Sequence, residues 1–164
     1  MKTLLIIRHA KSSWDATALN DFERTLNERG KKDAPVMAQR LLDKKVNIDA
    51  FVSSPAKRAK KTAELFCTTY NKNLEDIVFV SALYHPSAET IFSVVEQLDN
   101  KFSNVAIFSH NEGITEFANK LADNFVVDNM PTCSVCAVEI KIDKWKDFTK
   151  SKRELLFFFS PERL

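Results

Sequence analysis

The chain has 164 residues, of which 45% are hydrophobic and 28% are charged, and its formal net charge is +2 at pH 7. These values are typical of a globular protein, and the length suits a single domain over residues 1–164. A net charge this small does not favour binding to nucleic acid or to an anionic membrane, so a positively charged site has to be local. The chain's two glycines, Gly30 and Gly113, cannot form a Walker loop or a dinucleotide-binding fingerprint, which excludes nucleotide sites of those two kinds.

The cysteines and the apolar runs indicate where the protein is found. Three cysteines, an odd number, in a chain without a secretory signal favour a reducing compartment. The apolar run between Lys2 and Arg8 is too short for a signal sequence, and no run reaches the ~20 residues of a membrane span. Cys133 and Cys136 have a redox-like spacing, but they lie in a predicted strand, where residues three apart point to opposite faces. We therefore expect a cytoplasmic protein with neither a metal site nor a redox site at these cysteines.

Short apolar runs alternate with helical patterns along the chain. The apolar runs predict strands at 3–8, 50–53, 77–81, 104–109, 134–140 and 154–159, and helices are predicted near 27–43, 55–70, 87–99 and 111–122. Continuous rather than alternating hydrophobicity is typical of strands that are covered on both faces. The order predicts an α/β fold, a three-layer α/β/α sandwich with a mostly parallel central sheet, whose last strands are antiparallel at an edge.

The ends of the first two helices carry specific signals. Asn27 is a plausible N-cap for the first helix, but Pro35 removes a backbone hydrogen bond eight residues later, so we expect a kink or a late start. Gly30 is expected to permit close backbone packing. In the second helix, Ser54 is predicted to cap the amino end and Pro55 to take the first position.

Arginine and histidine side chains follow three of the predicted strands. Arg8 and His9 come after the first strand, Arg58 lies in the first turn after the second, and His110 follows the fourth. In such sheets ligands bind outside the carboxyl ends of the strands, and a helix amino end favours an anion. Two arginines and two histidines with no carboxylate in these segments indicate a cradle for phosphate, because the arginine fork can hold two phosphate oxygens.

His9 is the expected nucleophile within this cradle. A neutral imidazole can attack phosphorus and carry the phosphoryl group as phosphohistidine. Arg8 is its neighbour in sequence, and positive neighbours disfavour the protonated imidazole. The lone pair of the attacking nitrogen is therefore expected to be available near neutral pH.

Three segments of the chain resemble a known family. Residues 8–10 (RHA), 53–63 (SSPAKRAKKTA) and 109–111 (SHN) resemble the motifs of the histidine phosphatase superfamily, which has the phosphoglycerate-mutase-like fold. Residues 21–26 (DFERTL) with Gly30 after them, the short chain and the ending at 160–161 (SP) look most like SixA-type phosphohistidine phosphatases. The resemblance spans nearly the whole chain.

The resemblance implies roles for the four residues of the cradle. His9 would be the phosphorylated nucleophile, and Arg8, Arg58 and His110 would hold the phosphoryl oxygens as charge moves through the transition state. No metal and no other cofactor is implied, since these side chains do the neutralising work of a metal ion.

The proton donor is not specified by these motifs. Larger relatives carry a glutamate on an insertion after the third strand, where this chain has only ALYHPSAET, with Glu89 as one candidate. Asp21, three residues before Arg24, is the preferred alternative. Arg24 is expected either to bind phosphate peripherally or to pair with an acidic neighbour, and His85 reaches the same edge of the sheet, where it is a candidate for contact with substrate.

The leading hypothesis is a metal-independent phosphatase that acts on phosphohistidine in proteins, with a phosphorylated protein as its partner. A phosphorylated imidazole departs from phosphorus more easily than an alkoxide, so this substrate demands less from an acid.

The alternatives are a phosphatase for small phosphate esters and a non-catalytic module that binds phosphorylated partners. A metal site of three histidines is disfavoured because arginines repel a metal ion. The basic run at 57–61 is interpreted as a solvated helix face rather than a nucleic-acid site. The oligomeric state is left open.

Overall fold

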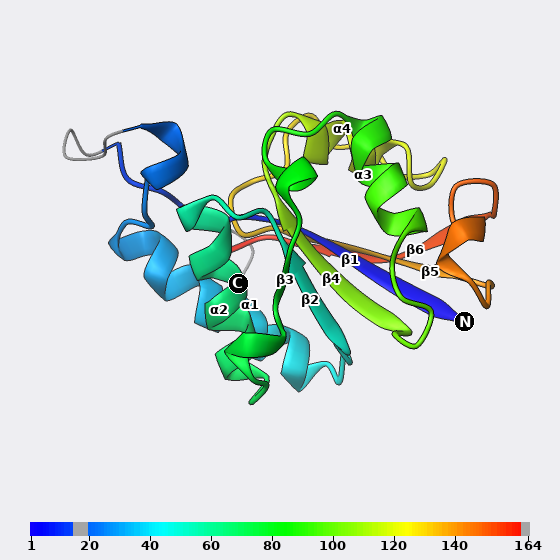
Figure 1. The fold of residues 1–164 in the computed structure, drawn as a ribbon, viewed down its shortest axis with the longest axis horizontal. Coiled ribbons are helices and arrows are strands. Elements are labelled where there is room, and N and C mark those ends of the chain that lie inside the picture. The colour runs from blue at the N-terminus through cyan, green and yellow to red at the C-terminus, as the bar shows by residue number, and fades with distance from the viewer. Residues whose placement is uncertain (15–19, 162–164) are drawn as a thin grey trace.

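The computed structural model describes residues 1–14 and 20–161 (Figure 1). The strands are β1 (Lys2–Arg8), β2 (Ala50–Ser53), β3 (Val78–Phe79), β4 (Asn104–Ser109), β5 (Val135–Ile140) and β6 (Arg153–Phe159). The α-helices are α1 (Glu28–Asp43), α2 (Lys57–Thr69), α3 (Ala88–Glu96) and α4 (Gly113–Asn119). Short 3-10 helices are η1 (Asp21–Glu23), η2 (Leu74–Asp76), η3 (Ser81–Leu83) and η4 (Trp145–Asp147).

The strands form one six-stranded sheet in the order β3-β2-β4-β1-β5-β6. Strands β3, β2, β4 and β1 are parallel, whereas β5 runs antiparallel to both β1 and β6. The predicted α/β fold with a mostly parallel sheet and antiparallel strands at one edge is confirmed. Because β1, β2 and β4 are parallel, the segments that follow them leave the sheet at the same edge.

Helices cover both faces of the sheet, and side-chain alternation along β1 explains why. Leu4 and Ile6 belong to one core cluster, which includes residues of α3 and α4, and Leu5 and Ile7 belong to the other, which includes residues of α1 and α2. All four are fully buried. Successive side chains of a strand point to opposite faces, so a continuous apolar run is what a strand between two helical layers needs. Figure 1 shows α1 and α2 on one side of the strands and α3 and α4 on the other.

Helix α1 corrects the expectation of a late start. It begins at Glu28, and the side chain of Asn27 caps it by accepting a hydrogen bond from the Gly30 amide at 2.9 Å. Pro35 lies inside the helix, which continues to Asp43. The helix tolerates one missing amide because its inner face packs against the sheet through four fully buried side chains, those of Ala34, Met37, Ala38 and Leu41.

The predicted cap of α2 is wrong. The helix begins at Lys57, and its N-cap is Ala56, which makes no side-chain capping bond. The Ser54 hydroxyl instead accepts a hydrogen bond from the Ala56 amide at 3.2 Å and lies 2.7 Å from His110 Nε2. Ser54, which the sequence pattern predicts to be a helix cap, therefore contacts His110 instead. The predicted strand at 77–81 is also shorter than expected, because only Val78 and Phe79 pair with β2.

Gly30 lies against another backbone segment, and we predict that alanine is not tolerated there. A Cβ atom at this position would overlap the carbonyl oxygen of Lys11. Glycine-to-alanine substitution inside a helix ordinarily stabilises by about 1 kcal/mol, but here the clash is expected to lower the free energy of unfolding by about 1–3 kcal/mol. Urea unfolding measures the change, with Lys32→Ala on the exposed face of α1 as the control. A Gly30→Ala variant as stable as the control would contradict the packing.

The lengths and compositions of the helices bear on membrane insertion. Within residues 1–14 and 20–161, every helix is too short or too polar to cross a lipid bilayer.

Candidate active site

A pocket of ≈ 290 Å³ lies at the carboxyl ends of the parallel strands. Its lining includes the four residues of the expected phosphate cradle and three of the further candidates, namely Arg8, His9, Arg58 and His110 with Asp21, Arg24 and His85. Lys11, Ser12, Trp14, Asn111 and Thr132 complete the lining. A larger groove of ≈ 810 Å³ runs beside β3 and α3, and none of the expected site residues lines it.

His9 follows β1 and is held in one tautomer by its own backbone. Its Nδ1 lies 2.7 Å from the carbonyl oxygen of Ala10, which can only accept, so Nδ1 carries the hydrogen. Nε2 therefore keeps its lone pair, and Arg58 Nε donates toward it at 3.3 Å. His9 is 6% exposed, which leaves access to its ring only through the pocket. The geometry presents a nitrogen nucleophile with a fixed orientation.

His9 is neutral at physiological pH. Burial lowers its pKa most, the hydrogen bond to Ala10 opposes this, and the positive charges of Arg58, Arg8 and Arg24 lower it further, to about 3. The uncharged form is the one that can attack phosphorus.

His110 follows β4 and lies beside His9, with the two ring centroids 5.1 Å apart. Its Nε2 is 2.7 Å from Ser54 Oγ, and its Nδ1 is buried without a hydrogen-bond partner among the described residues. When the Ser54 hydroxyl donates to Nε2, Nδ1 carries the hydrogen and is a free donor. Burial lowers the pKa of His110 most, and nearby His9, Arg58 and His85 lower it further against the opposing effect of Asp21, to about 2.

Arg58 is the second residue of α2 and is 3% exposed. Its three nitrogens are all engaged: Nε donates to His9 Nε2, Nη1 donates to the backbone oxygen of Asp21 at 2.7 Å, and Nη2 donates to Asp21 Oδ2 at 2.9 Å. The guanidinium plane is thereby fixed by contacts on both ends of its fork. One edge of it faces the ring of the expected nucleophile.

Arg8 is the last residue of β1, and it also lines the pocket. Its Nη1 donates to the carbonyl oxygen of Met130 at 2.7 Å, and its Nε is buried without a partner among the described residues. Burial and the charge of Arg58 lower the pKa of Arg8, yet an arginine side chain remains charged in proteins. Arg8 therefore adds a second guanidinium to the pocket, and its Nε has no hydrogen-bond partner among the described residues.

Asp21 is the hub of the hydrogen bonds on the pocket wall. Its Oδ1 accepts from Arg24 Nη1 at 3.0 Å, and its Oδ2 accepts from Arg58 at 2.9 Å and from the Tyr84 hydroxyl at 2.7 Å, with His85 Nε2 at 3.1 Å. Burial raises the pKa of Asp21, but the hydrogen bonds from Tyr84, Arg58 and Arg24 outweigh this and hold it well below its ordinary value. In this arrangement Asp21 is a carboxylate and has no proton to donate.

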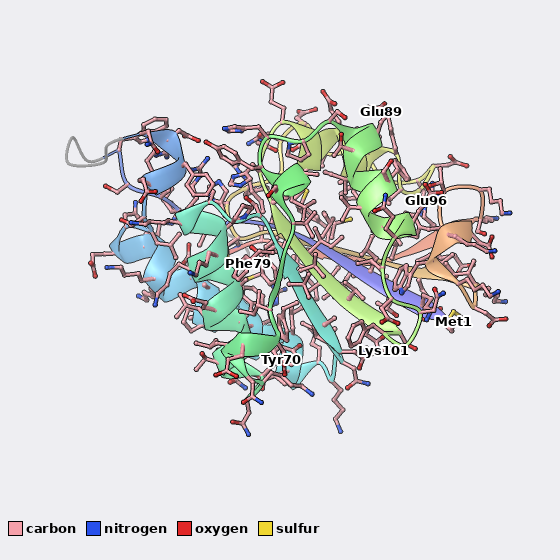
Figure 2. The ribbon with its side chains drawn as sticks, viewed as in Figure 1. Met1, Tyr70, Phe79, Glu89, Glu96 and Lys101 are labelled. Atoms are coloured by element: carbon pink, nitrogen blue, oxygen red, sulfur yellow. The ribbon has the colours of Figure 1, made fainter. Side chains whose placement is uncertain are left out.

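The other candidates differ in how the structure places them. Arg24 pairs with Asp21 and also lines the pocket, and the Trp14 ring lies over its guanidinium at 3.5 Å. Glu89 is not among the pocket residues: it lies in the first turn of α3, as the label in Figure 2 shows, exposed and 3.0 Å from Lys120 Nζ. The structure therefore brings Arg24 to the site and leaves Glu89 outside it.

Sequence reasoning missed three residues of this site. Ser54 was interpreted as a helix cap, although its hydroxyl contacts His110. Tyr84 donates to Asp21, and its ring lies edge-on to that of His110 at 5.4 Å between centroids. Trp14 is 80% exposed at the pocket rim. The position of Tyr84 next to His85, in a segment that reaches the same edge, was a usable signal for it.

The depressed pKa values of His9 and His110 predict acid sensitivity. Both are neutral in the fold and bind a proton in the unfolded chain below about pH 6.5, so stability falls as pH drops from that value toward the folded pKa values. Each is expected to cost about 2 kcal/mol of unfolding free energy at pH 5 relative to neutral pH. Urea unfolding at pH 7.5 and pH 5 measures the loss, and a His9→Asn variant should lose about half of it. Equal stability at the two pH values would show that these histidines are not buried as neutral groups.

Comparison with known proteins finds similar sequences and similar folds. Residues 4–79 match the model of the histidine phosphatase superfamily (branch 1). A structure named phosphohistidine phosphatase SixA from Agrobacterium tumefaciens superposes with a TM-score of 0.82 at 23% identity, covering 98% of each chain. A protein histidine phosphatase SixA complexed with tungstate gives a TM-score of 0.82 at 20% identity, also covering 98% of each chain. Phosphoserine phosphatase 1 of Hydrogenobacter thermophilus is 38% identical over 79 residues, which are 47% of this chain and 36% of that enzyme.

Proposed function

We propose that the chain is a phosphatase of the histidine phosphatase superfamily, whose model matches residues 4–79. We further propose that it works through a phosphohistidine intermediate on His9, without a metal ion, and that it acts on phosphohistidine in proteins. The observation that supports this most directly is the state of the His9 ring. Nδ1 is fixed by the Ala10 carbonyl, and Nε2 keeps its lone pair beside the Arg58 guanidinium. A nucleophile that is oriented and uncharged at neutral pH needs only a bound phosphoryl group to react.

In the proposed first step, His9 Nε2 attacks phosphorus and the leaving group departs on the opposite side. Arg8, Arg58 and His110, which line the pocket with His9, hold the phosphoryl oxygens. These donors are in place before the charge develops, which is the condition for strong electrostatic stabilisation in a site with little water. Water then attacks the phosphohistidine and releases inorganic phosphate. We expect full activity in the presence of a chelator.

Two observations favour phosphohistidine as the substrate. The chain shares its fold over nearly its whole length with proteins named SixA. A phosphorylated imidazole is also a good leaving group, which suits a pocket whose own aspartate is ionised. The second candidate substrate is a small phosphate ester, which the similarity of about half of the chain to a phosphoserine phosphatase favours. We also propose a cytoplasmic location, in keeping with three cysteines that are all free and buried.

Trapping the intermediate tests the mechanism, and a substrate comparison tests the specificity. The protein is mixed with a phosphorus-labelled substrate, quenched in alkali and digested, and the labelled peptide is sequenced. We expect an acid-labile, alkali-stable label on His9. Values of kcat/KM for a phosphohistidine carrier protein and for a panel of small esters are expected to favour the carrier. Phosphate binding without label and without turnover would identify a non-catalytic binding module instead.

A further inference from the structure

We infer that His85 is the proton donor to the leaving group, oriented by the carboxylate of Asp21. This inference rests on the proposed function and adds to it the acid that the motifs leave unassigned. His85 lines the pocket that contains His9, Arg58 and His110, and its Nε2 is 3.1 Å from Asp21 Oδ2. The carboxylates that sequence alone suggested do not fill this role, since Asp21 is ionised and Glu89 lies outside the pocket.

The position of His85 matches the place where a leaving group must be. Displacement at phosphorus proceeds with the attacking and leaving atoms roughly in line, so the leaving group lies on the side away from His9 Nε2. His9 is 6% exposed at the base of the pocket, whereas the side chain of His85 is 54% exposed at its mouth. The His110 ring neighbours both of them, with its centroid 5.1 Å from that of His9 and 5.6 Å from that of His85. A phosphoryl group held beside His9 and His110 thus directs its leaving atom toward the mouth.

His85 is also held in place as a catalytic imidazole has to be. Its ring packs on that of Tyr84 with centroids 4.2 Å apart, and its backbone has a φ of 50°, a left-handed conformation that is uncommon for a residue with a side chain. With Nε2 on the aspartate, Nδ1 is the nitrogen left for the substrate. An aspartate on one imidazole nitrogen orients the ring, and so fixes which nitrogen faces the substrate. The charged and titratable groups around it are Asp21 from η1, Arg24 after η1, Arg58 from α2, His110 after β4 and the neighbouring Tyr84.

The proton balance closes over the two steps. In the first, the bond between phosphorus and the leaving atom breaks, its electron pair stays on the leaving atom, and protonated His85 gives that group its proton. On a phosphohistidine substrate the proton goes to the ring nitrogen that is not bonded to phosphorus. In the second step water attacks the phosphoryl group on His9 and returns a proton to His85. The P–N bond to His9 breaks with its electron pair on Nε2, and His9 leaves as the neutral imidazole that began the cycle.

A leaving-group comparison on His85→Gln tests the role. The parameter is kcat/KM, which covers only the steps up to departure of the leaving group. For an alkyl phosphate such as phosphoserine, whose alkoxide needs a proton, the variant is expected to lose on the order of 10²–10⁴. For p-nitrophenyl phosphate, whose leaving group departs unprotonated, the value should stay within about threefold of wild type.

Two further variants separate a proton donor from a structural contact. Asp21→Asn removes a contact of Arg58 as well as that of His85, so it should slow both esters. Glu89→Gln, which changes the exposed carboxyl on α3, should slow neither. Equal losses of His85→Gln on both esters would mean that His85 only positions the pocket wall, and normal rates on both would mean that it has no part in catalysis. Either result overturns the inference, while labelling of His9 in wild type shows independently whether the proposed function holds.

Discussion

Replacing His9 with asparagine is expected to reduce turnover by roughly 10⁴-fold or more, because the oriented nitrogen that attacks phosphorus is removed. Asparagine keeps much of the volume of the imidazole but has no basic nitrogen. The ring it replaces is held by Ala10 on one side and contacted by Arg58 on the other, so the oriented lone pair is lost completely. Initial rates with a phosphohistidine carrier and the phosphorus-label experiment measure the loss.

Controls for this variant have to show that only the nucleophile is gone. Arg8, Arg58 and His110 remain, so inorganic phosphate should still raise the melting temperature of His9→Asn. The near-UV circular dichroism should match that of the wild-type protein. A variant that turns over substrate within tenfold of wild type would refute covalent catalysis by His9, whatever else the pocket binds.

Replacing Arg58 with lysine is expected to reduce kcat by on the order of 10²–10³, although the charge is kept. The guanidinium makes three directional contacts, to His9 Nε2, to the Asp21 backbone oxygen and to Asp21 Oδ2. A single ammonium cannot make all three in that geometry. Lysine is therefore expected to orient neither the phosphoryl oxygens nor the Asp21 carboxylate as arginine does.

Arg40→Lys is the matched control for this change. Arg40 belongs to α1, stacks on the Phe159 ring and is not among the pocket residues, so its replacement removes a half-buried guanidinium without touching the site. Steady-state kinetics on both variants gives the comparison. If Arg58→Lys were as active as Arg40→Lys, positive charge alone would suffice and the forked contact would be irrelevant to rate.

Most of the fold was accessible from the sequence because burial on both faces leaves a direct pattern. Strands β2 and β4 have the predicted bounds, since every residue between their ends is apolar and both are covered by helices. The edge strand β3 was overestimated, because Val78 and Phe79 pair on one side only and are largely exposed. A hydrophobic run does not show how many of its residues pair with a neighbouring strand.

The site was predictable in its positions and less so in its chemical states. The segments after parallel strands must meet at one edge, so proximity of Arg8, Arg58 and His110 followed from topology, and the structure places them around one pocket. Whether Asp21 holds a proton depends on partners 37 and 63 residues away, at Arg58 and Tyr84. No local pattern records such contacts. The same reason explains why a serine before a proline resembled a helix cap rather than a partner of His110.

The carboxylate on Arg58 has a consequence for repeated catalysis. The Arg58 guanidinium is already paired with the Asp21 carboxylate when a phosphoryl group binds. Its attraction for free phosphate is therefore reduced. We therefore expect Asp21 to compete with phosphate for Arg58, so that product inhibition is weaker and phosphate departs faster after each cycle.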